Sequence, residues 1–335
     1  MKIGMVSNWY GRPQGHCYVS RDILKILLEA GHEVHMYRIG NNDIDIDFPQ
    51  PTTMTTNESR NIPKQDFENW LDKVKPEWCI FNEYLDWWTE DHDKLDICKE
   101  RAIKTTGLLI YERMDLKDNN YDKYDKAFCL SKHHSDILNK NGYNSVHIPW
   151  GINFEEMDNI NVIPNDKITY YHCAGAGGAG GRKNTQAIVD AYNMIKTDNT
   201  ELIITHTASK VYSRDDILKF IKLSDVVINC SKWESLGLGT LEANACGKPV
   251  IVCDGEPMNE LVEDGVNGYR VKSKKTTDSA VTCPAYEVDV NELAKCMKKI
   301  QDKLILDSLK KNAIRIAKEK FDWKKNKNLL LEVLK

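Results

Sequence analysis

The sequence predicts an α/β protein made of two doubly wound, Rossmann-like domains. Short apolar runs alternate with segments of helical period along most of the chain, which is the pattern of a parallel sheet covered by helices on both faces. The alternation is interrupted by a polar stretch that ends at Asp166 and resumes at Ile168, so two α/β series of similar size are expected. A length of 335 residues is enough for two domains of ordinary size.

The first series begins with the apolar run 2–8, which predicts a strand. The loop 11–15 leads into a helix with apolar positions at helical spacing, and Gly31 is placed to end that helix as its C′ residue. Residues 33–39 predict the next strand, whereas the polar stretch 41–63 predicts a surface loop. Further strands are expected at 78–81, 107–111, 126–130 and 145–148, with a helix near 131–140.

The second series continues the same alternation. Its strands are expected at 168–173, 201–206, 225–230 and 249–253, and its helices near 184–195, 214–222, 238–246 and 290–300. From about residue 304 the chain is predicted to be helical and rich in lysine. The predicted domains are 1–153 and 154–321. Ligands of such sheets bind beyond the carboxyl ends of the strands, so with two sheets face to face we expect the active site in the cleft between the domains.

Composition and charge narrow the class of protein. With 41% apolar and 29% charged residues, the chain has a soluble globular composition. The segment 41–100 has fifteen acidic and six basic residues and would repel a polyanion, so nucleic acid is disfavoured as a partner. The segment 295–335 has thirteen basic and five acidic residues. It could contact an anionic membrane as a peripheral surface, or it could be a solvated helix face.

Localisation and redox state follow from what is missing in the pattern. The apolar start is broken at Ser7 and Asn8, so no secretory signal is expected, and no run approaches the roughly 20 apolar residues that cross a bilayer. The ten cysteines are scattered singly, without a Cys-x-x-Cys pair. We therefore expect a cytoplasmic protein with reduced, buried thiols and without a zinc or redox site.

The most informative segment is Glu234-Ser-Leu-Gly-Leu-Gly-Thr-Leu-Glu242, which follows an apolar strand and is followed by Ala-Asn-Ala-Cys-Gly-Lys-Pro-Val-Ile. It places a carboxylate, a glycine turn, a helix start and a second carboxylate in order. A helix N-terminus presents unpaired N–H groups that bind phosphate. Carboxylates accept hydrogen bonds from pairs of hydroxyls, as on a sugar or a ribose. Hydroxyls at both ends with phosphates between them describe a nucleotide-sugar; the alternative is an amphipathic helix with two surface glutamates.

A second segment, rich in glycine, also predicts a phosphate-binding site. In Tyr171-His-Cys-Ala-Gly-Ala-Gly-Gly-Ala-Gly-Gly-Arg-Lys-Asn184 a strand feeds a glycine-dense turn that opens a helix, so backbone N–H groups can approach a phosphate closely. Arg182 and Lys183 supply the positive charge that a diphosphate requires. A glycine-rich turn can also be only a flexible loop, but here it has a strand before it, a helix after it and two adjacent cations.

The segment 234–242 resembles the Glu-x7-Glu signature of the retaining glycosyltransferase family 4, whose members have the two-Rossmann GT-B fold. Gly237, the run 241–243 and the run 247–251 carry the likeness beyond the two glutamates. Weaker family landmarks extend it over almost the whole chain: Gly15, 31–34, 125–131, Gly142, 148–153, Glu260, 267–270 and 321–323. The resemblance implies that the final helix, at about 322–335, packs back on the N-terminal domain.

The resemblance also implies roles for individual residues. Glu234 would bind hydroxyls of the transferred sugar, and Glu242 the hydroxyls of the ribose. Lys183 and Arg182 would stabilise the diphosphate, although relatives place their arginine several residues before the lysine and here the two adjoin. Backbone groups would complete the donor site at Gly15, Gly181, Leu236, Gly237 and Leu238. The base would lie near 207–212, paired by backbone groups of Lys210 and Val211 and stacked on Tyr212, which could equally be an exposed tyrosine without a ligand.

The N-terminal half resembles the family less. Relatives often carry a histidine at the end of a central strand, close to the reacting carbon, but the corresponding stretch 109–115 has none. Glu112 or Asp115 could take that role, or both could be plain loop carboxylates. Asn82, Glu83 and His16 are further candidates. Trp87 and Trp88 could stack on an acceptor sugar or be buried in the core.

The sequence therefore predicts a retaining glycosyltransferase that moves a sugar from a nucleotide-diphosphate sugar, with UDP favoured and GDP second, to an acceptor hydroxyl on a glycan, a lipid or a small molecule. No metal and no further cofactor are expected, because the diphosphate has cations of its own and the acidic run Asp43-Ile-Asp-Ile-Asp47 lies away from the donor-binding strands. A nucleotide-sugar epimerase, a catalytically inactive binding module and a transferase acting on modified DNA bases are the alternatives.

Overall fold

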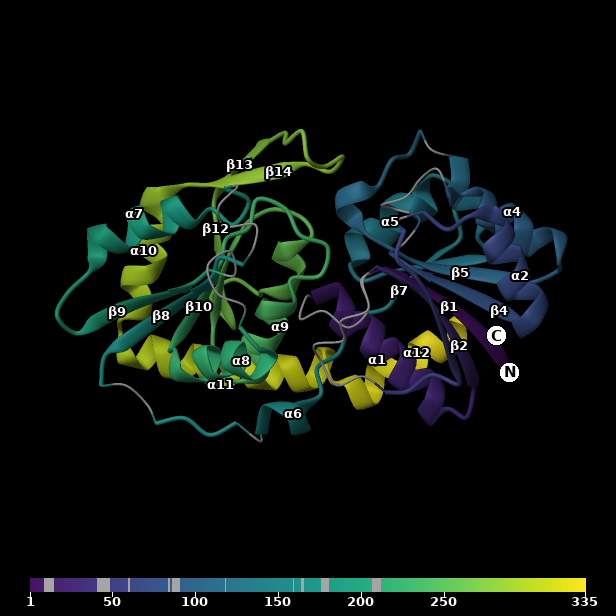
Figure 1. The fold of residues 1–335 in the computed structure, drawn as a ribbon. Coiled ribbons are helices and arrows are strands. Elements are labelled where there is room, and N and C mark those ends of the chain that lie inside the picture. The colour runs from purple at the N-terminus through teal and green to yellow at the C-terminus, as the bar shows by residue number, and fades with distance from the viewer. Residues whose placement is uncertain are drawn as a thin grey trace. The chain divides into compact units, whose positions relative to one another are not determined.

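Two compact units make up the chain, Met1–Ile148 with Lys327–Lys335 (unit 1) and Pro149–Asn326 (unit 2). The structure is a computed structural model, drawn in Figure 1. It describes the following residues: 1–8, 15–40, 49–59, 61–83, 85, 91–117, 119–158, 160–163, 166–175, 181–206 and 212–335. The units divide near residue 148 and again within the last helix, whereas the predicted domain boundaries are at 153 and 321.

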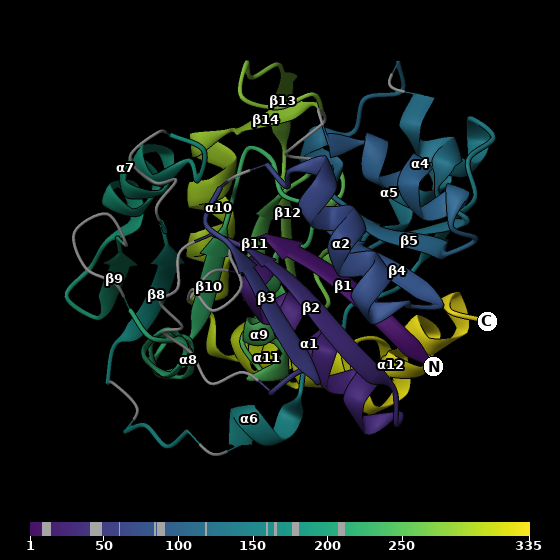
Figure 2. The same cartoon turned by 45° about the vertical axis from the view of Figure 1, so that its right-hand side comes forward.

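Unit 1 is built on a seven-stranded parallel sheet with the order β3-β2-β1-β4-β5-β6-β7. Figure 2 shows β3, β2, β1 and β4 side by side. The order runs outwards in both directions from β1 and β4, which is the doubly wound arrangement. The strands are β1 (Lys2–Asn8), β2 (Glu33–Ile39), β3 (Thr53–Asn57), β4 (Trp78–Asn82), β5 (Lys104–Leu109), β6 (Lys126–Cys129) and β7 (Ser145–His147).

Helices lie between the strands of unit 1. The first of them has a regular end: Gly31 has φ +76°, and the N–H groups of Gly31 and His32 donate to the carbonyls of Leu28 and Leu27, as in a Schellman motif. The predicted glycine C-cap is confirmed. The helices are α1 (Gly15–Glu29), α2 (Lys64–Val74), α4 (Asp93–Glu100) and α5 (Lys132–Lys140), with short 3₁₀ turns η2 (Tyr111–Arg113) and η3 (Asn119–Lys123).

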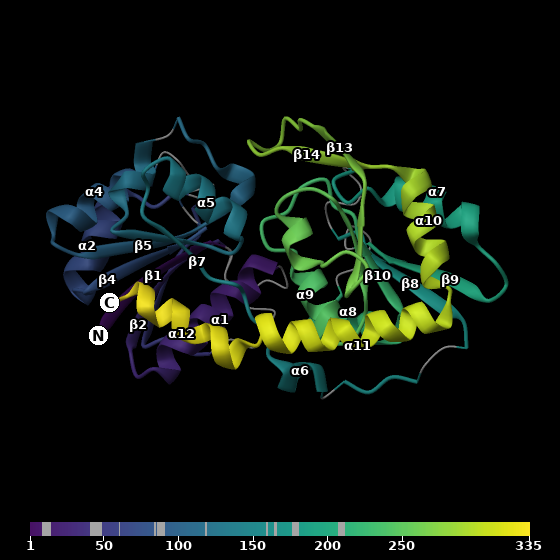
Figure 3. The same cartoon turned by 180° about the vertical axis from the view of Figure 1, so that it is seen from behind.

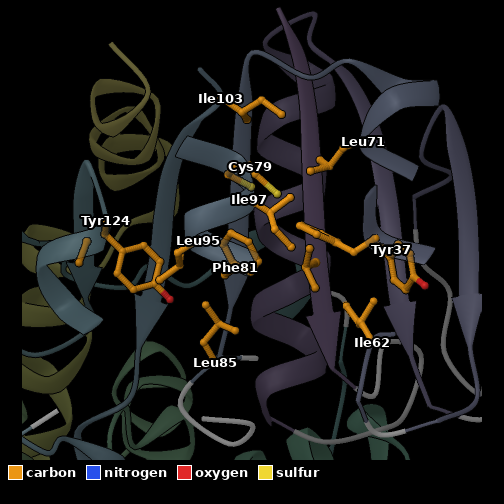
Figure 4. Close-up of a cluster of buried hydrophobic side chains, with 14 of the residues drawn as sticks. Tyr37, Ile62, Leu71, Cys79, Phe81, Leu85, Leu95, Ile97, Ile103 and Tyr124 are labelled. Atoms are coloured by element: carbon orange, nitrogen blue, oxygen red, sulfur yellow. The ribbon is translucent and has the colours of Figure 1, made fainter. Parts of the chain in front are cut away.

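A large apolar cluster fills one face of the unit 1 sheet. Its strand residues include Val6, Cys79 and Phe81, and its helix residues include Trp70 on α2 and Leu95 on α4, all of them buried. Figure 4 shows the side chains of this cluster gathered on one side of the strands. The aromatic rings meet at angles, for example Tyr37 and Trp70 with centroids 5.3 Å apart and an interplanar angle of 89°. This core fixes the carboxyl ends of β4 and β5.

The prediction of a surface loop over 41–63 is wrong in part. Residues 41–48 and 60 lie outside the described residues, but Thr53–Asn57 forms the edge strand β3, parallel to β2. An edge strand has only one paired side, so its residues can be polar and half-exposed, as they are here. The β-branched threonines favour extended backbone, which explains how a polar sequence forms a strand.

Unit 2 has a five-stranded parallel sheet with the order β12-β11-β10-β8-β9. The strands are β8 (Ile168–Cys173), β9 (Thr200–Thr205), β10 (Val226–Asn229), β11 (Val250–Cys253) and β12 (Gly268–Val271). A separate antiparallel hairpin, β13 (Ser273–Thr276) with β14 (Ala285–Val288), follows them. The first four strands were predicted; β12 and the hairpin were not.

Helices cover both faces of the unit 2 sheet. Alternate residues of β8 show this: Tyr170 joins the cluster formed with α7 and α10, while Tyr171 stacks on Phe220 of α8 at 5.7 Å. In Figures 1 and 3, α7 lies beside α10, and α11 runs as one long helix along the unit. The helices are α6 (Phe154–Asp158), α7 (Thr185–Ile195), α8 (Arg214–Leu223), α9 (Leu238–Ala245), α10 (Val290–Ile300), α11 (Lys303–Lys320) and α12 (Trp323–Val333), with the 3₁₀ turn η5 (Met258–Leu261).

The last helix begins in unit 2 and ends in unit 1. Within unit 2, Ile152 forms a β-bridge with Asp322, and the rings of Trp150 and Trp323 are 4.6 Å apart. A Cβ on Gly151 would lie 2.5 Å from the backbone of Trp323, so only glycine permits this approach. Within unit 1, Lys327 pairs with Glu29 at the end of α1. The predicted fold class of two doubly wound, Rossmann-like domains is confirmed.

Candidate functional site

Strand order points to one edge of the unit 2 sheet. From β8 the chain crosses to β9 on one side and then to β10 on the other, so the order reverses between β8 and β10. In open α/β sheets a ligand binds beyond the carboxyl ends of the strands at such a switch point. The segments leaving these two strands are the glycine-rich stretch that ends at Lys183 and the stretch that begins at Ser231. Both predicted motifs therefore begin at the switch point.

The two motifs meet at the Glu234 carboxylate. Lys183 Nζ donates a hydrogen bond to Glu234 Oε1, and Arg182 Nη1 lies 3.1 Å from the same oxygen. Ser231 Oγ also donates to Glu234 Oε1, at 3.0 Å. The Glu234 side chain is only 13% exposed. The predicted residues Arg182, Lys183 and Glu234 thus form one cluster, with both cations on a single carboxylate oxygen.

Glu234 is an ionised acceptor. Its burial alone would raise the pKa, but the charges of Lys183 and Arg182 and the hydrogen bonds from Lys183 and Ser231 outweigh burial and lower the pKa to about 2. The carboxylate therefore carries its charge at neutral pH and cannot serve as a proton donor there. A carboxylate has about four lone-pair sites, so one oxygen saturated with cations leaves capacity on the other for hydroxyl groups.

Arg182 is further held by an aromatic ring. Its guanidinium carbon lies 4.6 Å from the ring centroid of Trp233, and Nη1 donates to the Trp233 carbonyl at 3.3 Å. The Trp233 indole N–H in turn donates to Asp278 Oδ2 at 3.4 Å, in the connection between β13 and β14. The hairpin that the sequence did not predict therefore supports the position of the arginine.

The start of α7 is anchored to the sheet. Asn184, just before α7, has φ +52° and its amide donates to the Cys230 carbonyl at 2.9 Å, linking the two motifs through the backbone. His172 on β8 donates from Nδ1 to the Ile228 carbonyl at 2.9 Å, and its Nε2 lies 3.0 Å from Thr185 Oγ. Burial lowers the pKa of His172 to about 4, so the ring is neutral and Nε2 accepts from the Thr185 hydroxyl.

A chain of side-chain hydrogen bonds connects Glu234 to α9. The Asn229 amide donates to Thr240 Oγ at 2.9 Å, and Ser231 Oγ lies 3.0 Å from Asn229 Oδ1 as well as from Glu234. These residues leave β10 and enter the first turns of α9, so the carboxylate and the helix start are positioned together. The single hydroxyl proton of Ser231 is shared between these two acceptors, so Ser231 links the end of β10 to the carboxylate.

The α9 start requires a glycine. Gly237 has φ +65°, a conformation rarely adopted by residues with a side chain, and a Cβ there would lie 2.7 Å from Met258 Sδ. Leu236 and Leu238, which flank it, are half-buried. The predicted strand–turn–helix order of this motif is present, and α9 begins four residues after Glu234 in the sequence (238 − 234), with the N–H groups of its first turn at that end.

The second predicted carboxylate, Glu242, has a partner that the sequence analysis missed. Glu242 lies on α9 and is 4% exposed. Arg214, the first residue of α8, places Nη1 2.6 Å from Glu242 Oε1 and Nε 3.4 Å from Glu156 Oε2 on α6. One guanidinium thus lies between two carboxylates.

Other predicted donor-site residues have less definite surroundings. Gly181 has φ +75° and is exposed, and a Cβ on it would meet no atom within 4 Å. Tyr212 packs edge-on against Phe220, with centroids 5.7 Å apart, so at least one edge of its ring is used for packing. Val211 and Lys210, the remaining predicted base contacts, lie outside the described residues.

The unit 1 candidates are spread over several elements. Gly15 is the exposed first residue of α1, followed by the half-buried His16. Glu112 lies in η2, half-buried, directly after Tyr111, whose hydroxyl is 3.2 Å from His133 Nε2. Asp115 is exposed, and its carboxylate accepts from the Lys117 N–H within its own loop.

Two further unit 1 candidates lie at the end of β4. The Asn82 amide donates to Ser20 Oγ in a buried network that includes Ser7. Glu83 has φ +56°, and its N–H donates to the Leu108 carbonyl. Trp87, Trp88 and the acidic run 43–47 lie outside the described residues.

Metal-binding clusters and membrane-spanning helices are both absent from the described residues. They contain no group of three or more His, Cys, Asp or Glu side chains that could hold a metal ion. None of the helices in the described part of the chain is long and apolar enough to cross a bilayer. All ten cysteines are free thiols; seven are buried, as expected, whereas those at 173, 246 and 296 are partly exposed. That the thiols are reduced stays a prediction.

Part of the site could have been found from sequence. Asn229 and Ser231 are polar residues at the end of a predicted strand, next to a ligand motif, and that position is a usable signal. Arg214 has no such signal, because it is distant in sequence from Glu242 and only the packing of α8 against α9 brings the two together.

Comparison with known protein families finds a match that lies within unit 2. Residues 180–303 match the family model described as "Glycosyl transferases group 1". A D-inositol 3-phosphate glycosyltransferase from Salinispora tropica is 33% identical over 106 residues, which cover 32% of this chain and 21% of that protein. Sucrose synthase 2 of rice is 30% identical over 100 residues, 30% of this chain and 11% of that protein. The matched segment is thus about a fifth or less of these relatives' length.

Solved structures resemble the chain over nearly its whole length. Sucrose-phosphate synthase from Thermosynechococcus elongatus has a TM-score of 0.74 at 15% identity, covering 99% of this chain and 98% of that one. Anabaena HepE in complex with UDP and glucose also has a TM-score of 0.74 at 15% identity, with coverage of 100% and 99%. At such identities the likeness concerns the fold alone. It confirms the predicted GT-B class, two Rossmann-like domains with parallel sheets.

Proposed function

We propose that this chain is a retaining glycosyltransferase that transfers a sugar from a nucleotide-diphosphate sugar to an acceptor hydroxyl. The observation that carries the proposal is the cluster of Arg182, Lys183 and Glu234 at the switch point of the unit 2 sheet. Cations, an ionised carboxylate and a helix start in one place match the diphosphate and the hydroxyls of such a donor. The cluster lies within the segment that matches the group 1 glycosyl transferases.

The proposed chemistry is mostly electrostatic. The bond between the anomeric carbon and the phosphate oxygen breaks, and negative charge develops on the departing diphosphate. Lys183, Arg182 and the N–H groups at the start of α9 stabilise this charge. Glu234, ionised at neutral pH, accepts hydrogen bonds from sugar hydroxyls and holds the donor in place. These groups make a metal ion unnecessary in the proposed mechanism.

Retention follows in the proposal from attack on the face that the diphosphate leaves. The acceptor oxygen bonds to the anomeric carbon, and the acceptor proton passes to the leaving phosphate oxygen. Glu242 binds the ribose hydroxyls. UDP is the favoured nucleotide, as the Anabaena HepE structure in complex with UDP and glucose suggests, and GDP is the second choice. Unit 1 would bind the acceptor, a glycan, a lipid-linked sugar or a small molecule, with Glu112 as the candidate side chain near the reacting carbon.

A ligand panel followed by product analysis tests the proposal. Thermal melting with UDP, GDP, ADP and their glucose conjugates should show a higher melting temperature with one nucleotide series, because a ligand of the folded state stabilises it by mass action. With that donor and a mixture of simple sugar acceptors, NMR should detect a product with the anomeric configuration of the donor. An isomerised nucleotide-sugar in the absence of an acceptor would instead indicate an epimerase, and a product of inverted configuration would contradict retention.

A further inference from the structure

Arg214 is a mostly buried arginine, whereas arginines are mostly exposed in proteins. Its side chain is only 14% exposed and lies within ion-pair distance of two carboxylates, Glu242 at 2.6 Å and Glu156 at 3.4 Å. Glu242 is almost fully buried, whereas Glu156 is about one third exposed. Removing water from a carboxylate and a guanidinium costs several kcal/mol per ion, so the arrangement requires a compensating role or excellent geometry.

Helix stability does not explain Arg214. It is the first residue of α8, where the positive end of the helix dipole disfavours a cation. The helix already has a complete capping box, in which Ser213 Oγ accepts from the Asp216 N–H and Asp216 accepts from the Ser213 N–H. Asp215 and Asp216 also supply the negative charge that the first turn favours. The arginine is thus unfavourable for its own helix, and its two ion pairs are with other helices.

We propose that Arg214 is a positioning residue for the ribose of the donor, acting through Glu242. This inference rests on the proposed function, in which Glu242 accepts hydrogen bonds from the ribose hydroxyls. The guanidinium keeps the buried Glu242 ionised and fixes its rotamer, while Glu156 holds the guanidinium on its other side. A carboxylate oxygen paired with arginine retains lone pairs, so the same group can also accept hydroxyl donors.

The physical basis is the cost of an uncompensated buried charge. Without a cation, the buried carboxylate at 242 would lose much of its ionised form or turn towards solvent. Either change weakens the hydrogen bonds to ribose, since an ionised acceptor binds a hydroxyl more strongly than a neutral one. A merely structural ion pair that joins α6, α8 and α9 would change stability but would not change the discrimination between ribose and 2′-deoxyribose.

The experiment measures that discrimination. Calorimetric titration of the full chain with UDP and with 2′-deoxy-UDP gives an affinity ratio for the wild type, Arg214→Gln, Arg214→Lys and Glu242→Gln. Arg315→Gln serves as the matched control, because Arg315 forms an exposed ion pair with Glu319 on α11 of the same unit. In the wild type we expect UDP to bind about tenfold or more tightly than 2′-deoxy-UDP, the value of one hydrogen bond to a charged group.

Arg214→Gln should lower the affinity for UDP by about tenfold or more. Its ratio of UDP to 2′-deoxy-UDP affinity should be close to that of Glu242→Gln. Arg214→Lys keeps the positive charge but loses the planar guanidinium, so its affinity ratio should lie between those of the wild type and Arg214→Gln. Arg315→Gln should behave as the wild type does. In the Glu242→Gln background, Arg214→Gln should change UDP affinity by less than about threefold, because residues that act as a unit are non-additive.

An Arg214→Gln protein that binds UDP with the wild-type ratio would overturn the inference while leaving the proposed function intact. Equal ratios for the wild type and Glu242→Gln would also overturn it, since Glu242 would then not bind ribose. A wild type that binds neither UDP nor GDP would overturn the proposed function, and this inference with it. Melting curves verify that each variant is folded; if Arg214→Gln is not folded, the ratio for Arg214→Lys decides.

Discussion

The Glu234 carboxylate receives a lysine, an arginine and a serine hydroxyl on one oxygen. This pairing keeps its pKa at about 2 despite burial, so its charge does not change over the pH range in which most enzymes are measured. In the proposed reaction it is therefore a fixed negative group that orients the sugar and the two cations. A residue with that role contributes to transfer through geometry and charge and does not donate a proton.

Glu234→Ala is expected to lower turnover by at least about tenfold. The substitution removes the acceptor for sugar hydroxyls and leaves Lys183 and Arg182 without their shared partner. Initial rates with a saturating donor measure the effect, and Glu319→Ala, an exposed carboxylate on α11, is the control. Near-normal transfer by a folded Glu234→Ala protein would remove Glu234 from the mechanism.

At the residue scale, the sequence identifies candidate site residues better than it identifies the side chains that they contact. Glu234, Lys183 and Arg182 could be identified from their motifs, but the convergence of both cations on one carboxylate oxygen depends on tertiary packing. Arg214 could not be identified at all, since nothing in its local sequence distinguishes it from a surface arginine. Ion-pair partners that lie on different helices become visible only when the helices are packed.

The junction between β8 and α7 depends on a neutral histidine. His172 bonds to Ile228 of β10 and to Thr185 of α7, and burial holds its pKa at about 4, below its usual 6.5. Because the unfolded chain takes up the proton first, the contribution of His172 to the free energy of unfolding is complete above about pH 6.5. It is lost as the pH falls towards 4, by up to about 3 kcal/mol.

His172→Gln should therefore give a flatter dependence of the free energy of unfolding on pH between 7 and 4 than the wild type. Urea denaturation at several pH values measures this dependence. Parallel pH profiles for the wild type and His172→Gln would contradict a buried, neutral His172.

Two glycines near the start of α9 should respond differently to substitution by alanine in the stability of the protein. Gly237→Ala should destabilise the protein by about 1–2 kcal/mol, since an alanine is strained at φ +65° and its Cβ would press on Met258. Gly239→Ala, inside the helix with open space around it, should be neutral or stabilising by up to about 1 kcal/mol. Urea denaturation measures both. A destabilisation equal in the two variants would show that the turn at 237 is not specifically strained.

At the element scale, periodicity predicted the buried strands well and the peripheral ones poorly. The apolar runs of β1, β2, β8, β10 and β11 are unambiguous because most residues of these strands are buried. The edge strand β9 is only half-buried, and its sequence still predicts a strand. The threonine-rich β3 has one unpaired edge and few apolar residues, so its sequence is not distinguishable from a loop. The hairpin of β13 and β14 is likewise polar on its exposed positions, and the cysteine and proline near it suggest a loop.

At the scale of the whole molecule, the chain forms two large parallel sheets with separate cores, and apart from Gly15 the residues of the proposed donor site belong to unit 2. The predicted fold class followed from alternation of strands and helices over the full length, a signal that does not depend on any single residue. The acceptor could not be predicted, because unit 1 lacks strong motifs and its candidate residues are spread over several loops.

This division predicts where a donor nucleotide protects the backbone. Hydrogen exchange with UDP should slow at 182–185 and 231–242 of unit 2, because these amides contact the ligand or the side chains that bind it. Segments remote from the switch point, such as α10, should be unaffected. Protection that is absent from unit 2 and present only in unit 1 would place the nucleotide elsewhere.

If the cluster of Arg182, Lys183 and Glu234 binds a nucleoside diphosphate, Lys183 must contribute to the affinity. Calorimetric titration of UDP and GDP into the wild type and Lys183→Met measures that contribution. We expect one of the two nucleotides to bind at one site per chain, with an affinity about tenfold or more lower for Lys183→Met. Lys311→Met, which removes an exposed lysine of α11, should bind as the wild type does. Equal affinity of wild type and Lys183→Met, or no binding of either nucleotide, would contradict the claim.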